Sequence, residues 1–389
     1  MTTCEKTKYP MVFVHGMFGW GENEGINKKA PYWGATTGSL TEYLSGEGVE
    51  SYAASTGPLS SAWDQACELY AQLKGTRVDY GENHSGVYGH RRYGRTYKKP
   101  LFENWSEEKK VHLIGHSFGG NTIRLLVHLL KNGAPEEVAV TGEDTSPLFK
   151  GGQEDLVCSV TAICSPLNGT DTYEAVQRYK LMGPTRILTL IYTTSISRTK
   201  LNGKLIDFHL EQMGVHTTDE IKHRKPFFKA IKDLYVCKES IDYDMSEKGA
   251  EELNALVKAV PSVYYFSFCY NMLEKNKKGR LVPKNTKVPI LSFTSKLVIK
   301  YGKRMNKPSD GNDGLVGVDS AKHPKNQPHK MYAQDEPLSS GVWNVMPVRK
   351  GDHGTPIGLF ADREETHKFY NELVLLLATT EHNNISYKE

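Results

Sequence analysis

The amino-acid sequence has few cysteines and no long uncharged apolar run. Six cysteines in 389 residues do not make a disulfide framework, although a single bridge is compatible with that number. Four of them, Cys67, Cys158, Cys164 and Cys269, fall inside apolar periodic segments, where small buried thiols are common. No apolar run approaches the roughly 18 to 20 residues that span a bilayer, and the first residues lack an apolar signal region. The sequence predicts a soluble chain, and a mature protein whose signal had been removed would look the same.

An excess of charge of either sign is also missing. The 49 basic and 45 acidic side chains nearly balance, for a formal net charge of +4. This balance does not indicate nucleic acid as a partner and says little about an acidic membrane. We expect a solvated loop for the densest basic stretch, because it is rich in turn residues and poor in aromatic ones. That stretch contains Lys275, Lys277, Lys278, Arg280, Lys284 and Lys287.

A serine lies between a predicted strand and a predicted helix. Residues 111–120 read Val-His-Leu-Ile-Gly-His-Ser-Phe-Gly-Gly, an apolar run that leads directly into a helix-patterned segment. This is the context of a nucleophile elbow, G-x-S-x-G, with Ser117 as the nucleophile. Gly115 and Gly119 suit the tight turn because a Cβ at either position would collide with the neighbouring strand or helix. A plain Gly/Ser loop is the alternative interpretation of the pentapeptide by itself.

Buried strands alternate with helical segments along the chain, without repeats or low-complexity tracts. Strands are predicted at 10–16, 111–115, 156–164 and 263–268, and helical spacing occurs at 63–73, 123–130 and 363–378. The alternation predicts an α/β protein with a mostly parallel sheet covered by helices on both faces. We expect one catalytic domain over 1–389, elaborated by a cap.

A serine nucleophile needs a histidine to take its proton and an acid to orient that histidine. In the α/β-hydrolase fold the order along the chain is Ser, acid, His. His353 lies in a Gly-flanked loop shortly before the last predicted helix and fits the base, the alternative being a surface histidine. For the acid, Asp313 precedes Gly314 and an apolar pair, and we prefer it to Asp310, which resembles an ordinary turn residue. Asp319 is a third choice.

Two backbone N–H groups are expected to stabilise the oxyanion. One is that of Phe118, just after the nucleophile, and the other is that of Met17, in the Gly-rich loop after the first strand. Because only the N–H groups are used, the side chains at these positions are weakly constrained.

Four scattered residues have the side chains of a zinc site. Asp64, His84, His90 and Asp244 offer two imidazoles and two carboxylates, which could complete a tetrahedral set. Their spacing alone favours the plainer interpretation, in which the histidines are loop residues and Asp64 caps a helix.

The α/β pattern changes over roughly 171–238, where apolar residues gather around Gly183-Pro184. One interpretation is a pair of core helices. The other is an amphipathic lid that covers an apolar pocket and opens at a lipid surface.

Collinear motifs across nearly the whole chain carry a family resemblance. They include His15-Gly16-Met17-Phe18-Gly19-Trp20-Gly21, Trp63-Asp64-Gln65-Ala66-Cys67-Glu68, Gly94-Arg95-Thr96-Tyr97, Tyr243-Asp244, Asn312-Asp313-Gly314 and Gly341-Val342-Trp343-Asn344. With these motifs the chain resembles the zinc-containing bacterial true lipases, the branch of the thermostable bacillus and staphylococcal lipases. The resemblance implies an α/β-hydrolase fold with a helical lid over roughly 171–238.

The resemblance also implies roles for particular residues. The triad would be Ser117, Asp313 and His353, with the amides of Met17 and Phe118 as oxyanion donors. A structural zinc ion would be held by Asp64, His84, His90 and Asp244, in an extra region of roughly 60–100 and 240–250.

The chain departs from the family in three places. Relatives often carry Gln at the position of Phe118, so we expect an altered pocket wall there with the amide donor intact. The family's calcium ligands fall on Thr355 and Phe360, so the resemblance does not support calcium binding. The Lys-rich segment from about 270 to 310 resembles the family poorly.

The sequence thus predicts a secreted-type lipase that hydrolyses triacylglycerols through a serine acyl-enzyme. We expect it outside the cell, acting on lipid esters at an oil–water interface. Three alternatives stay open: a hydrolase of soluble or polymeric esters without interfacial activation, a noncatalytic lipid-binding protein on a hydrolase scaffold, and a metallohydrolase that uses the zinc for chemistry.

Overall fold

A parallel seven-stranded sheet forms the centre of the computed structural model, which describes residues 6–181, 206–215, 229–230, 232–234, 238–307, 311–334 and 336–383. The strand order is β11-β12-β7-β6-β5-β1-β2, and every neighbouring pair is parallel. The strands are β1 (Met11–Val14), β2 (Ser51–Ala54), β5 (Val111–His116), β6 (Val157–Ile163), β7 (Tyr264–Phe268), β11 (His329–Met331) and β12 (Trp343–Val345). The predicted parallel α/β sheet is therefore confirmed.

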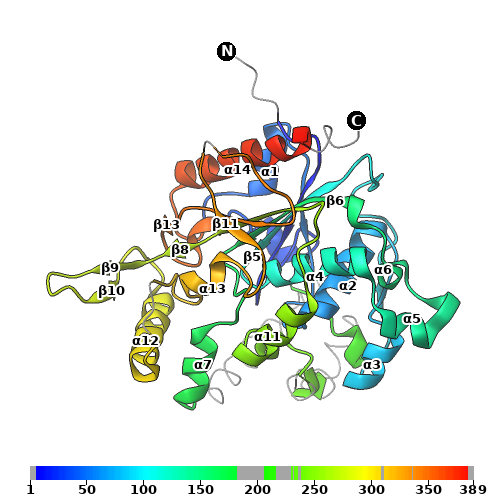
Figure 1. The fold of residues 1–389 in the computed structure, drawn as a ribbon, viewed down its shortest axis with the longest axis horizontal. Coiled ribbons are helices and arrows are strands. Elements are labelled where there is room, and N and C mark those ends of the chain that lie inside the picture. The colour runs from blue at the N-terminus through cyan, green and yellow to red at the C-terminus, as the bar shows by residue number, and fades with distance from the viewer. Residues whose placement is uncertain are drawn as a thin grey trace.

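Helices cover both faces of this sheet (Figure 1). On one face pack α1 (Leu40–Gly46) and α14 (Arg363–Asn383), and on the other α2 (Ala62–Lys74) and α4 (Gly119–Asn132). Strand β1 shows why two cores form, because its side chains alternate in direction. Met11 and Phe13 join the core under α1 and α14, whereas Val12 and Val14 join the core under α2 and α4.

The remaining helices lie at the edges of this layered body. They are α3 (Glu82–Tyr88), α5 (Pro135–Thr141), α6 (Pro147–Lys150), α7 (Asp171–Arg178), α10 (Ile241–Asp244), α11 (Glu247–Leu256), α12 (Pro289–Met305) and α13 (Val318–Lys322). Within the described residues, three small two-stranded sheets accompany them: β3 (Arg77–Asp79) with β4 (Tyr93–Thr96), β9 (Leu273–Lys275) with β10 (Leu281–Pro283), and β8 (Tyr270–Asn271) with β13 (Arg349–Lys350). The β9–β10 hairpin projects from the body at the left of Figure 1.

The 171–238 segment, for which core helices or a lid were the alternatives, is described only in part. Helix α7 and the short stretch 206–215, which includes the 3-10 turn Glu211–Met213, are described. Residues 182–205, 216–228, 231 and 235–237 lie outside the described residues, as does Asp310.

Candidate active site

Ser117 sits in a sharp turn between β5 and α4. Its φ is +55°, a left-handed value that is strained for a residue with a side chain. Its N–H donates to the carbonyl of Ile163 on the neighbouring strand, at 2.8 Å. The flanking glycines leave no room for a Cβ: one at Gly115 would lie 2.4 Å from the backbone of Gly119, and one at Gly119 would lie 2.3 Å from the carbonyl oxygen of Val14. The turn therefore has the geometry of a nucleophile elbow.

Asp313 and His353 are joined by hydrogen bonds although 40 residues separate them. His353 Nδ1 lies 2.7 Å from Asp313 Oδ2, and the His353 N–H donates to the Asp313 carbonyl at 2.8 Å. The other carboxylate oxygen, Oδ1, accepts from the amides of Leu315 and Val316 at 2.9 and 2.8 Å. With both oxygens committed, the carboxylate holds the imidazole with Nδ1–H towards the acid, which leaves Nε2 for proton transfer. The alternative acid Asp319 instead pairs with Lys322 and is largely exposed.

The loop after β1 packs directly against the serine. A Cβ on Gly16 would lie 2.6 Å from Ser117 Cβ. Phe18, with φ +58°, donates its N–H to Pro58, and Gly19 donates to Gly16. Among the described residues, neither the Met17 N–H nor the Phe118 N–H donates to a protein acceptor. Both are therefore available to an oxyanion beside Ser117.

A pocket of about 450 Å³ opens above Ser117 and His353. Its lining is predominantly apolar and comes from the β1 loop, α7, the start of α12 and the loops around the acid and the histidine. It includes Met17, Phe18, Tyr173, Val176, Met245, Val288, Ile290, Leu291, Leu315, Val316, Ile357 and Leu359. A pocket with such walls suits the hydrocarbon part of a ligand.

The side chain of Phe118 does not line this pocket. It is fully buried in the core beneath α2 and α4. The expectation that Phe118 alters the pocket wall is therefore wrong: the residue after the serine caps the N-terminus of α4, and its side chain points into the core rather than towards the pocket.

His116 links the loop after β1, here called the oxyanion loop (residues 15–21), to the loop that carries His353. The sequence did not indicate this role. Its Nε2 lies 2.9 Å from the His353 carbonyl oxygen, and its Nδ1 lies 2.6 Å from the Tyr32 hydroxyl. Burial lowers the pKa of His116 well below its usual value, so the ring carries one N–H, which the carbonyl requires at Nε2. The Tyr32 hydroxyl also accepts the N–H of Gly16, at 3.1 Å. Only the position before the serine could have signalled this contact.

Three of the four residues predicted as zinc ligands come together. Asp64, His84 and His90 bring one ligand atom each to within 4.8 Å of one another, although they lie on α2, α3 and the following loop. Asp64 Oδ1, His84 Nε2 and His90 Nε2 are buried and have no hydrogen-bond partner among the described residues. Buried nitrogen and oxygen atoms that are not hydrogen-bonded and lie within ion-pair distance of one another, as His84 Nε2 does of Asp64 Oδ1 at 3.7 Å, fit zinc chemistry.

Asp244, the fourth predicted ligand, lies beside this cluster without bringing a ligand atom to it, and its role as a zinc ligand stays a prediction. Its Oδ2 accepts the N–H of Ala62 at 2.7 Å, and its carboxylate interacts electrostatically with His84 of the cluster and with the buried guanidinium of Arg124. Burial raises the pKa of Asp244 to about 7. The carboxylate beside the cluster is that of Glu239, whose Oε2 lies 3.2 Å from His84 Nε2. Glu239 lies two residues before α10 and Asp244 is the last residue of that helix, and both carboxylates interact with His84.

The electrostatics around His84 also fit a bound metal cation. Burial acts to lower the pKa of His84, but the carboxylates of Glu239 and Asp64 outweigh it and raise the pKa to about 9. The site therefore favours positive charge at the position that a metal cation would take.

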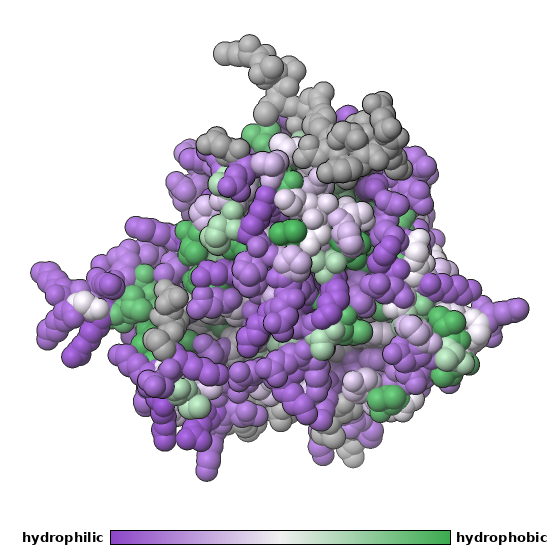
Figure 2. All heavy atoms as spheres, in the orientation of Figure 1, coloured by the Kyte–Doolittle hydropathy of each residue, from purple (hydrophilic) through white to green (hydrophobic). Residues whose placement is uncertain are grey.

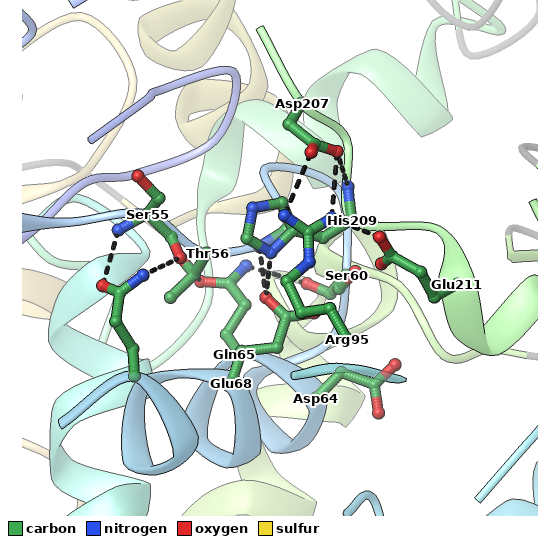
Figure 3. A network of polar contacts seen from close by, with 12 residues as sticks. Ser55, Thr56, Ser60, Asp64, Gln65, Glu68, Arg95, Asp207, His209 and Glu211 are labelled. Atoms are coloured by element: carbon green, nitrogen blue, oxygen red, sulfur yellow. Dashed lines mark hydrogen bonds and ion pairs between the residues drawn. The ribbon is translucent and has the colours of Figure 1, made fainter. Parts of the chain in front are cut away.

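A buried polar network ties the 206–215 stretch to α2 and β4 (Figure 3). His209 Nδ1 lies 2.9 Å from Glu68 Oε2, on α2. Arg95, on β4, makes a two-point contact with Asp207 at 3.0 Å and also pairs with Glu211. Apolar residues of the same stretch pack against Met17 and Phe18. The network therefore fixes the 206–215 stretch, which packs against Met17 and Phe18 of the loop after β1.

A parallel sheet with helices on both faces, a serine elbow after β5 and an acid–histidine pair on later loops define the α/β-hydrolase class. Within it, the chain belongs to the family described as "Lipase-like, C-terminal domain", whose profile matches residues 7–387. Among the described residues, none of the helices is long and apolar enough to cross a bilayer.

Named relatives agree with this family. The lipase of Staphylococcus hyicus is 36% identical over 360 residues, which is 91% of this chain and 54% of the relative. Lipase 2 of Staphylococcus aureus is 33% identical over 358 residues, 90% of this chain and 50% of the relative. This chain thus spans about half the length of the curated relatives it matches.

Solved structures are similar over the whole chain. The crystal structure of Staphylococcus hyicus lipase has a TM-score of 0.81, with 32% identity and 98% of each chain covered. EstA from Clostridium botulinum has a TM-score of 0.80, with 34% identity, 96% of this chain and 88% of that chain covered.

Proposed function

We propose that this protein hydrolyses carboxylic esters of lipids, most of all triacylglycerols, through an acyl-enzyme on Ser117. The observation that carries the proposal is the Asp313–His353 hydrogen bond of 2.7 Å beside a strained serine at an apolar pocket. The names of the relatives, several of them lipases, support the same substrate class.

In the proposed reaction, Ser117 Oγ attacks the ester carbonyl carbon while His353 Nε2 takes the hydroxyl proton. The negative oxygen of the intermediate rests on the N–H groups of Met17 and Phe118, each worth about 3 kcal/mol. The carbon–oxygen bond to the alcohol then breaks as His353 returns the proton to the leaving oxygen. Water, activated by the same histidine, releases the fatty acid.

The test is the Ser117→Ala variant on p-nitrophenyl esters, with Ser45→Ala at an exposed serine as the control. We expect turnover to fall by at least about 10³-fold in the first and to stay unchanged in the second. Labelling by a fluorophosphonate should disappear only in Ser117→Ala. Wild-type turnover in Ser117→Ala would remove the assignment, and a wild-type protein that takes no label would favour a noncatalytic lipid-binding role.

Rates on tributyrin separate a lipase from a hydrolase of soluble esters. A lipase should gain activity when tributyrin passes from the dissolved to the emulsified state, whereas the alternative enzyme should follow the dissolved concentration alone. We propose the first behaviour, and with it an extracellular setting in which emulsified lipid is met.

We further propose that a structural zinc ion is bound by Asp64, His84 and His90, with Glu239 as the fourth ligand. The support is the cluster of three buried ligand atoms that make no hydrogen bond, with the Glu239 carboxylate 3.2 Å from His84 Nε2. Such an ion would connect α2, α3 and the segment that carries Glu239, just before α10.

A further inference from the structure

Residues 275–307 form a basic surface that the rest of the molecule does not neutralise. Eleven of the 49 basic residues lie in this segment and none of the 45 acidic ones does, so the remaining chain carries a formal charge of −7. Lys284 pairs with Glu274 at 3.0 Å, and Lys307 with Glu247 at 3.3 Å. The other nine have no carboxylate within 4.0 Å among the described residues.

The tip of this surface has a fixed shape. The sequence suggested a solvated loop here, but the chain forms the β9–β10 hairpin, with Lys275 paired to Leu281. Asn276 organises its turn: its side-chain oxygen accepts the N–H groups of Lys278 and Arg280 at 2.9 and 3.1 Å. The hairpin therefore places its exposed cations on regular, hydrogen-bonded secondary structure rather than on an irregular loop. These cations are Lys275, Lys277, Lys278 and Arg280.

Exposed apolar side chains lie next to these charges, at the edge of the catalytic pocket. Ile290 and Phe293, 60% and 55% exposed, are three residues apart on the first turns of α12 and so share one face. Ile290 lines the pocket together with Val288 and Leu291. Figure 2 shows the hydrophilic projection with a hydrophobic area beside it. Exposed apolar residues beside unpaired cations are typical of protein surfaces that bind lipid.

We propose that residues 275–307 form a docking surface for a negatively charged lipid layer. The hairpin cations contact anionic head groups, while Ile290 and Phe293 enter the apolar layer at the pocket rim. Charge complementarity selects an anionic surface, and the apolar pair selects lipid over a soluble polyanion such as nucleic acid, which offers no apolar layer. The proposal rests on the proposed function only in taking the pocket as the place where lipid enters.

Vesicle binding tests the proposal without any turnover. Full-length protein is sedimented with vesicles of ether-linked phosphatidylcholine, with and without ether-linked phosphatidylglycerol, neither of which has a carboxylic ester bond to cleave. We expect binding that requires phosphatidylglycerol and weakens as salt is raised. Removing four cations, Lys275→Gln/Lys277→Gln/Lys278→Gln/Arg280→Gln, should weaken it by about fivefold per cation and so by more than about 100-fold. Phe293→Ser should weaken it by about tenfold.

The matched control removes four exposed lysines elsewhere, Lys98→Gln/Lys99→Gln/Lys150→Gln/Lys368→Gln, and should bind nearly as the wild type does. Both quadruple variants should keep wild-type turnover on a monomeric soluble ester, because none of their substituted residues lines the pocket. The proposal is overturned if the two quadruple variants bind equally, if phosphatidylglycerol makes no difference, or if the wild type binds a DNA oligonucleotide but no vesicle. Vesicle binding in this pattern by a protein without esterase activity would uphold the docking surface and reject the proposed function.

Discussion

At the scale of single residues, the Asp313 carboxylate does most to define the site, because each of its oxygens has assigned partners. Oδ1 is held by two amides and Oδ2 by His353 Nδ1. A carboxylate fixed in this way both sets the tautomer of the imidazole and stabilises the imidazolium that forms during the reaction.

Asp313→Asn should therefore leave the fold intact and lower kcat by about 10³- to 10⁴-fold, because the amide removes the charge and can stabilise the wrong tautomer. Steady-state kinetics on a soluble p-nitrophenyl ester measure this, with KM little changed. Asp319→Asn, at a largely exposed carboxylate paired with Lys322, should match the wild type. A loss of equal size in both variants would contradict the assignment of the acid.

Two carboxylates five residues apart make the metal assignment testable. Glu239→Gln should lower the zinc content of dialysed protein well below one ion per chain, because the variant loses a charged ligand that lies 3.2 Å from His84. Asp244→Asn should keep its zinc, since Asp244 serves the Ala62 amide and Arg124. Metal analysis of folded protein distinguishes the two carboxylates, and the reverse pattern would support Asp244 as the ligand.

The sequence indicated these residues unequally, for physical reasons. Ser117 and His353 could be recognised because a tight turn and a Gly-rich loop each produce a local sequence pattern around the residue. The identity of the fourth carboxylate depends on how α10 turns the backbone between 239 and 244, and the contacts of His116 depend on Tyr32, 84 residues away. Local patterns do not encode such pairings.

At the scale of elements, α2 joins segments that are distant in the sequence. The spacing predicted a helix over 63–73, and the helix ends at its left-handed C-cap Gly75, with φ +67°. The same helix also buries Asp64, Glu68 and Gln72. Their partners come from distant segments, such as His209, which lies 141 residues beyond Glu68. Periodicity therefore located the helix but could not show which of its polar residues are buried.

The Glu68–His209 pair predicts a pH-dependent stability. Burial and Arg95 act to lower the pKa of His209, but Glu68 and Glu24 raise it to about 10. Because this pKa is above the usual 6.5, protonated His209 stabilises the fold fully below about pH 6.5 and progressively less as the pH rises through 10.

His209→Gln should accordingly destabilise the protein by about 3 kcal/mol near pH 6 and by less near pH 10. Thermal unfolding of both proteins at a series of pH values measures the difference. A difference that stays constant, or grows, between pH 6 and pH 10 would contradict a charged His209.

The short strands could not be predicted from the sequence. β11 and β12 have three residues each, and only their parallel pairing with β7 makes them part of the sheet. A solvated loop was expected in place of the β9–β10 hairpin because the stretch is rich in turn residues and poor in aromatic ones, whereas its structure depends on the Asn276 turn.

At the scale of the whole molecule, the proposed zinc ion would act on stability before it acted on chemistry. The cluster joins α2 and α3 at a distance from the pocket lining, and none of its three residues lines that pocket. A metal there stabilises the folded state by mass action.

Chelation with EDTA should therefore lower the Tm of the wild type while turnover on a soluble ester at low temperature persists as long as the protein stays folded. Glu239→Gln should show a smaller drop in Tm on chelation, because less metal is bound at the start. Immediate loss of turnover with an unchanged Tm would instead indicate a metallohydrolase.

The separation of charge between residues 275–307 and the rest of the chain makes the molecule an electric dipole. In the field of a negative surface, a dipole experiences a torque that acts within about a Debye length, roughly 8 Å at physiological salt. The pocket rim lies at the positive end. The torque therefore turns the pocket towards the negatively charged lipid surface before the protein contacts that surface. A larger share of encounters then begins in the productive orientation, and this gain falls as added salt shortens the range of the field.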